Sequence, residues 1–150
     1  MPTSSYYIPN PAIRAEEAII AYISNSFSGS GLIYSDTLFF TGYGKEDKDG
    51  PAIVVAVNNY NEIYFNSRVY QFDVDIQVKE IAWDTATSSF RDFSGNVFAL
   101  FGDTRLAVPV INSITSDFRV YQMQVQQNSA TRAEDAWVST LSIRIIGCLN

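Results

Sequence analysis

The sequence of 150 residues contains no histidine, and this absence excludes several kinds of catalytic site. Without an imidazole there is no Ser-His-Asp triad, no Cys-His pair and no histidine-ligated metal. The catalytic groups that remain are carboxylate pairs, lysine and tyrosine. The sequence also contains no glycine-rich phosphate loop after a strand and no nucleophile elbow. We therefore expect a protein that is not an enzyme and that uses no cofactor and no metal.

Cysteine and basic residues are also scarce. The one cysteine, Cys148, excludes an internal disulfide and a cysteine-rich zinc site, and we expect it to be a small buried residue. Sixteen acidic against ten basic residues give a net charge of −6, which argues against a surface that grips nucleic acid through its phosphates. No secretory signal and no run of about 18 apolar residues is present. These features predict a soluble protein made in the cytoplasm, with no membrane partner.

The length and composition predict one domain over residues 1–150. Hydrophobic residues make up 47% of the chain, which is enough for a substantial core at this size. Residues 1–10 are polar and contain prolines, so we expect an extended N-terminal arm.

The central element of the predicted sheet is a long strand that begins at Val69. Its apolar side chains alternate with polar ones, which is typical of a strand with one buried and one polar face. The apolar set is Tyr70, Phe72, Val74, Ile76 and Val78, and the polar set is Gln71, Asp73, Asp75, Gln77 and Lys79.

Two amphipathic helices are expected. The first begins with Asn10 as N-cap and Pro11 as first helical residue, and it continues to Phe27. Its apolar residues recur near the helical period, and Arg14, Glu16 and Glu17 are expected outside this stripe. The apolar members are Ile13, Ala15, Ile19, Ile20, Ile23 and Phe27. The second helix carries an aromatic core stripe of Phe90, Phe93, Val97, Leu100 and Phe101.

The other segments predict shorter strands and a hairpin. Strands are expected at residues 38–40, 52–57 and 62–66, with a turn at 58–61. Pro109 makes residues 106–114 an edge strand or extended loop, because proline cannot donate to a strand ladder. Residues 118–127 and 136–146 form a hairpin with a loop at 128–135. The prediction is an α+β fold: a mixed or antiparallel β-sheet flanked by two α-helices, with a long C-terminal β-hairpin.

The polar faces of these strands are rich in uncharged hydrogen-bonding groups. Besides the polar set of the long strand, they carry Gln122, Gln124, Gln126, Thr140, Ser142 and Arg144. Few ions and many amides suit a face that meets another polar protein surface, and the alternative is a solvated face rich in glutamine. Asp73 and Asp75 lie about 7 Å apart on one face. An acid–base pair is conceivable at that distance, but surface carboxylates are the simpler interpretation.

The order of these elements resembles the tail terminator proteins of long-tailed bacteriophages. The segments that carry the resemblance are the helix at 11–27, the sheet centre at 53–55 and 70–78, the helix at 90–101 and the hairpin at 118–146. The resemblance covers nearly the whole chain and rests on element order and length, without a diagnostic motif. It implies a non-enzymatic virion protein of the tail and neck region, made in the host cytoplasm.

The resemblance further implies a homo-oligomeric ring, commonly of six copies. Such a ring caps the tail tube, ends its growth and joins it to the neck or connector proteins, while genomic DNA passes without specific binding. Candidate interface residues are Tyr6, Tyr7, Ile8, Leu106, Val108, Val110, Arg132, Glu134 and Asp135, and candidates for a polar or lumen face are Asp73, Asp75, Gln122 and Gln124. The alternatives are a neck or head-completion connector, and a small α+β ligand-binding domain or enzyme.

Overall fold

The fold is that of a computed structural model, which describes residues 10–27, 37–42, 51–65, 67–81, 87–132 and 136–149. The described elements are α1 (Pro11–Phe27), β1 (Leu38–Thr41), β2 (Ala52–Glu62), β3 (Val69–Ile81), α2 (Thr87–Ala99), α3 (Thr104–Ile114), β4 (Phe118–Arg132) and β5 (Ala136–Leu149). The predicted N-terminal arm lies outside the described residues except for Asn10.

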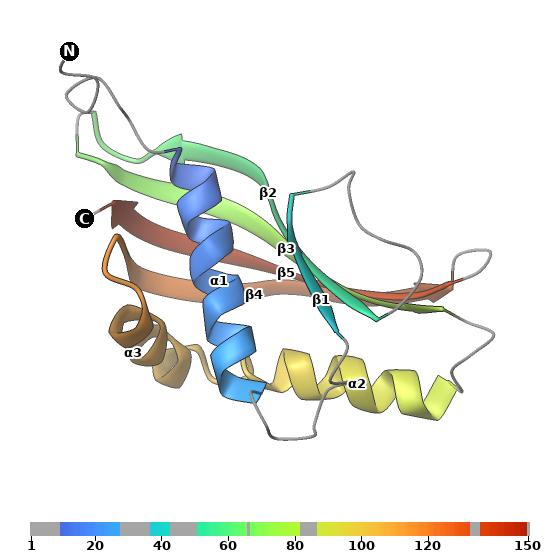
Figure 1. The fold of residues 1–150 in the computed structure, drawn as a ribbon. Coiled ribbons are helices and arrows are strands. Elements are labelled where there is room, and N and C mark those ends of the chain that lie inside the picture. The colour runs from blue at the N-terminus through green and yellow to red at the C-terminus, as the bar shows by residue number, and fades with distance from the viewer. Residues whose placement is uncertain are drawn as a thin grey trace, which may run out of the picture.

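One mixed sheet organises the molecule, with the strand order β1-β2-β3-β5-β4 (Figure 1). β1 is parallel to β2, and all other neighbours are antiparallel. The helices pack on one face of the sheet, because their buried side chains form a single core cluster with one alternate set of strand residues. The predicted α+β fold with a C-terminal hairpin is therefore confirmed, with a third helix that the sequence analysis did not predict.

β3 has the alternating burial that its sequence predicts. Phe72, Val74, Ile76 and Val78 are fully buried on the face that the helices cover. The residues between them are half-buried on the opposite face. This strand pairs with β2 along one edge and with β5 along the other, so it lies in the middle of the sheet.

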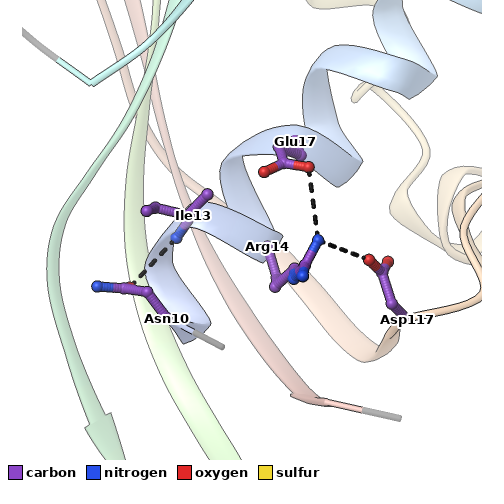
Figure 2. A network of polar contacts seen from close by, with 5 residues as sticks. All are labelled: Asn10, Ile13, Arg14, Glu17 and Asp117. Atoms are coloured by element: carbon purple, nitrogen blue, oxygen red, sulfur yellow. Dashed lines mark hydrogen bonds and ion pairs between the residues drawn. The ribbon is translucent and has the colours of Figure 1, made fainter. Parts of the chain in front are cut away.

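α1 begins where the cap residues predict. The Asn10 Oδ1 atom accepts hydrogen bonds from the backbone N–H groups of Ala12 at 2.9 Å and Ile13 at 3.4 Å, and Pro11 is the first helical residue. Ile13 itself is 47% exposed and lies outside the buried stripe to which it was assigned. The next residue, Arg14, contacts Asp117 at 2.9 Å and Glu17 at 3.8 Å, so it joins α1 to the segment before β4 (Figure 2).

α2 carries the predicted aromatic stripe into the core. Phe90, Phe93, Val97 and Phe101 are buried, and Leu100 packs against the same cluster. The Phe90 ring stacks on Trp137 of β5 at a centroid distance of 6.1 Å. The stripe is therefore a helix-to-sheet contact, as expected for aromatic residues at helical spacing.

β2 is one strand of 11 residues, so the prediction of a turn at 58–61 and a returning strand at 62–66 was wrong. The strand continues to Glu62 through a bulge between Val57 and Asn59, where the register with β3 shifts. A bulge accommodates the extra residue, Asn58, without ending the pairing. The predicted burial of the apolar run on both faces is confirmed for residues 52–56.

Residues 106–114 form most of a helix, so the prediction of an edge strand or loop was wrong. Asp103 is the N-cap, and its side chain accepts a hydrogen bond from the Arg105 N–H at 3.1 Å. Ala107 and Ile111 are buried at i, i+4 spacing. Pro109 removes the N–H that would bond to the Arg105 carbonyl, but this carbonyl belongs to an exposed residue and can be hydrated. The Asp103 cap and the i, i+4 pattern are sequence signals that the proline obscured.

β4 and β5 form the predicted hairpin, and both strands are longer than expected. β4 contains two register shifts, at 120/122 and 125/127. Its first residues are anchored by Asn112 of α3, whose amide donates to the Val120 carbonyl at 2.8 Å and accepts from the Val120 N–H at 2.7 Å. The side chain of Asn112 thus takes the place of a neighbouring strand at this point of the sheet edge.

Candidate interaction surface on the open sheet face

The face of the sheet opposite the helices, called the open face below, carries the polar side chains singled out from the sequence. Gln71, Asp73, Asp75, Gln77 and Lys79 come from β3, Thr140, Ser142 and Arg144 come from β5, and Gln122 and Gln124 come from β4. The β3 and β5 members are half-buried, whereas Gln122 and Gln124 are exposed. All four candidate residues for a polar or lumen face therefore lie on one surface.

Register places three of these residues in a row across neighbouring strands. Asp73 of β3 is opposite Arg144 of β5, and Arg144 is opposite Gln124 of β4. The Arg144 Nε atom donates a hydrogen bond to Asp73 Oδ1 at 3.0 Å, and the two side chains are 41% and 37% exposed. The row thus contains an ion pair whose charges balance.

Asp75 is held by uncharged donors on both of its neighbouring strands. Asn58 Nδ2 donates to Asp75 Oδ2 at 2.6 Å, and Ser142 Oγ donates to Asp75 Oδ1 at 2.7 Å. Asn58 is the residue of the β2 bulge, so the bulge brings its amide to the carboxylate. Both aspartates are therefore members of hydrogen-bond networks across the sheet.

Asn58 and Tyr121 also lie on this face. The sequence analysis missed both, because their positions depend on β-bulges. Asn58 was assigned to a turn, and Tyr121 alternates with Gln122 in the sequence, which is the position of a buried apolar residue in a regular strand. The first β4 bulge leaves Tyr121 53% exposed, with its hydroxyl 3.2 Å from the Cys148 Sγ atom. This hydrogen bond to Cys148 raises the pKa of the Tyr121 hydroxyl. Cys148 is buried, as predicted.

A buried carboxylate lies on the other side of the sheet, under α1. Glu16 is only 7% exposed, so the prediction that it lies outside the buried stripe was wrong, whereas Glu17 is exposed as expected. The Glu16 Oε2 atom accepts a hydrogen bond from the Val57 N–H at 2.8 Å, beside the β2 bulge. Burial raises the pKa of Glu16, and the Val57 hydrogen bond opposes this shift. Glu16 therefore joins α1 to the irregular part of β2.

The candidate interface residues are distributed differently from the open face. Leu106 and Val110 are 70% and 44% exposed on α3, whereas Val108 packs against the core. Arg132 is the last residue of β4. Tyr6, Tyr7, Ile8, Glu134 and Asp135 lie outside the described residues. The structure thus exposes two of these nine residues on a helix, where the sequence analysis had predicted an edge strand or extended loop.

Two further features concern metal ligands and membrane-spanning helices in the described part of the chain. No group of three or more histidine, cysteine, aspartate or glutamate residues is arranged there to hold a metal ion. No single described helix is long and apolar enough to cross a membrane. Only Ser88–Ala99 and Thr104–Ile114, bent by 75°, meet the length and composition test as a pair.

The fold and the surface define an α+β domain with helices on one face of a mixed sheet and a polar network on the other. No family model matches the chain, and no curated protein matches its sequence. Among solved structures, the fold is similar to a chain from a structure described as "Virion of native gene transfer agent (GTA) particle". The match covers 89% of this chain and 93% of that chain, with 10% sequence identity and a TM-score of 0.49. These values are too low to transfer a function from that particle.

Proposed function

We propose that this protein is a non-enzymatic virion component that forms a ring, of about six copies as in the tail terminators it resembles. The ring caps a phage tail tube, ends its growth and joins it to the neck or connector proteins. The observation that carries the proposal is the open face, where a sheet bears a hydrogen-bonding surface with its central charges already compensated.

The chemistry of the open face suits contact with another protein. A buried charge without a partner is expensive, and an interface must also satisfy the hydrogen bonds of the groups that it covers. Asp73 is paired with Arg144, and Asp75 accepts from Asn58 and Ser142, so neither carboxylate depends on water alone. The amides of Gln122 and Gln124 can both donate and accept towards a partner. Covering this face therefore costs less than covering a face of unpaired ions.

The charge of the chain fits a position beside passing DNA. The net charge is −6, and the whole chain has only ten basic residues. Strong phosphate binding needs several cations that are free to release condensed counterions from DNA. An acidic protein with few basic residues therefore allows DNA to pass without being held.

The arrangement of elements is a second line of support. The helix, the long central strand, the second helix and the C-terminal hairpin occur in the order on which the resemblance to tail terminators rests. The additional helix, α3, gives the domain another surface for contact with neighbouring copies.

The first experiment is the solution mass of the purified protein by light scattering, followed by negative-stain imaging. A ring with a central hole is the expected species, either alone or after addition of tail tubes that lack a terminator. Capped tubes that stop growing and become competent to join heads would support the proposal. Tubes that continue to grow, with the protein bound to DNA-filled heads instead, would favour a neck or head-completion role. Binding to neither partner would overturn the proposal.

A further inference from the structure

Two exposed apolar patches lie outside the open face. The hairpin tip consists of Tyr64 and Phe65, between β2 and β3, whose residues are 70% and 93% exposed. The α3 stripe consists of Leu106, Pro109 and Val110, which are all exposed. Single exposed apolar residues are ordinary, but neighbouring ones on one element indicate a contact surface.

The hairpin tip is held in place by its own backbone. Ile63 N–H donates to the Val69 carbonyl at 2.8 Å, and Ser67 N–H donates to the Tyr64 carbonyl at 3.0 Å. Arg68 has a φ of 60°, in the left-handed region that non-glycine residues seldom occupy, and its N–H donates to Glu62 Oε2 at 2.8 Å. A strained residue that is retained by several hydrogen bonds is typical of functional turns. The turn therefore presents its two aromatic side chains in a preformed geometry.

An aromatic cluster supports the strands below this tip. The ring of Tyr60 lies 6.0 Å from that of Tyr70 and 5.9 Å from that of Phe72, and Phe72 is fully buried. These contacts connect the end of the hairpin to the core. Preorganisation of this kind lowers the entropy that is lost when a side chain enters a partner.

The α3 stripe makes α3 apolar on two sides. Its inner side buries Ala107 and Ile111, and its outer side exposes Leu106, Pro109 and Val110 at i, i+3, i+4 spacing. A surface helix normally places polar residues on its outer side, as α2 does with Arg91 and Asp92. The outer side of α3 therefore has the composition of a contact surface.

The two patches lie on different parts of the sheet. The hairpin tip follows β2, whereas α3 packs beside β4, and β3 and β5 separate these two strands (Figure 1). Two different patches on one chain that fit each other give a head-to-tail contact, which closes into a ring when the rotation is suitable. The hairpin tip and the α3 stripe are two such different patches, and both are exposed and apolar.

We infer that the hairpin tip of one copy packs on the α3 stripe of the next copy. This inference rests on the ring arrangement proposed above and specifies its contact. A second copy is favoured over an anionic lipid surface, because the chain has a net charge of −6. Leu106 and Val110, already candidate interface residues, take the role of the acceptor surface.

Cysteine crosslinking of the full chain tests the contact. In a Cys148→Ala background, the Phe65→Cys and Val110→Cys variants are mixed and treated with a short bis-maleimide. We expect a crosslinked dimer from the mixture, a ladder of oligomers from the double variant, and no product from either single variant. Val125→Cys, 40% exposed on another part of the surface, replaces Val110→Cys as the matched control and should give no product. If Cys148→Ala impairs folding, the same variants are made with the buried Cys148 retained.

The outcomes separate this inference from the proposed ring. Self-crosslinking of Phe65→Cys would indicate a symmetric contact and overturn the inference, as would the absence of a Phe65–Val110 product. If rings are nevertheless seen by microscopy, only the assigned contact fails.

As an independent measurement, Phe65→Ser should lower the mean mass by light scattering at least twofold, with unchanged circular dichroism. If the tip binds lipid instead, the wild type binds phosphatidylcholine vesicles through it. In that case Phe65→Ser would abolish vesicle binding and leave the mean mass unchanged, and this result would overturn the inference.

Discussion

Arg144 Nε lies 3.0 Å from Asp73 Oδ1, across the two neighbouring strands β3 and β5. The two residues are 71 positions apart in the sequence, and both side chains are more than a third exposed. An ion pair in such a setting contributes little to folding, because water already solvates both groups. The ion pair matters more in an interface, because neither charge is then buried without a partner.

Arg144→Gln separates these two roles. The variant should change the free energy of unfolding by less than about 1 kcal/mol, because the pair is solvated in the single chain. It should weaken oligomer formation more strongly, because Asp73 would then be covered without its cation. Urea unfolding and light scattering at several protein concentrations measure the two effects. Arg91→Gln, on the exposed side of α2, is the control and should change neither. An unchanged oligomer mass for Arg144→Gln would contradict the assignment of the open face as an interface.

The buried Glu16 predicts a pH-dependent stability. Because burial raises its pKa in the folded protein, the folded state binds more protons than the unfolded state above the ordinary value of 4.5. Its contribution is therefore largest below pH 4.5 and decreases as the pH rises through the folded pKa. Glu16→Gln removes this titration, so the stability of the wild type relative to the variant should fall between pH 4 and pH 7. Urea unfolding across that range measures it, with Asp92→Asn on the exposed side of α2 as a control. A relative stability that rises with pH would show that the sign is wrong.

Gly147 occupies a position that has no space for a side chain. A Cβ atom there would lie 2.7 Å from the Arg119 carbonyl oxygen and 2.8 Å from Phe118 Cζ, both on the adjacent strand. Gly147→Ala should destabilise the protein by about 1–3 kcal/mol, because the hairpin must shift to accept the methyl group. Thermal or urea unfolding checks the effect.

Gly95→Ala is the opposite substitution on an exposed helix position. Among the described residues, no atom apart from the chain neighbours and the adjacent backbone of the helix lies within 4 Å of a Cβ built at Gly95 in the middle of α2. Alanine restricts the unfolded chain and favours the helix, so the variant should be more stable by about 1 kcal/mol. The same unfolding measurements apply. A loss of stability would mean that the exposed side of α2 is in contact with another molecule.

Asn112→Ala tests the anchor of β4. The substitution removes both hydrogen bonds to the Val120 backbone, which lies among buried residues, and should cost about 1–3 kcal/mol. Amide hydrogen exchange should also become faster at the beginning of β4, because the edge loses its side-chain partner. Ser113→Ala removes only a hydrogen bond to the Val110 carbonyl on the same helix and is the matched control. Equal effects of the two substitutions would argue against a special role for Asn112.

Local patterns in the sequence determined several elements of this protein. The alternation in β3, the Asn10 and Pro11 start of α1 and the aromatic stripe of α2 were predictable, because each depends on residues within a few positions of one another. The same holds for most of the open face, whose members apart from Asn58 and Tyr121 were identified from alternation. The hairpin of β4 and β5 was also expected, although its strands extend further.

Only the tertiary structure decided the rest, because the decisive interactions are distant in the sequence. α3 forms despite Pro109, since burial of Ala107 and Ile111 and the Asp103 cap outweigh the lost hydrogen bond. β2 continues past Asn58, because pairing with β3 stabilises the residues beyond the bulge. Strand order then places Arg144 beside Asp73 and the bulge amide of Asn58 beside Asp75. The sequence determined which side chains are polar and which elements carry them. The pairing of distant strands determined which of them meet.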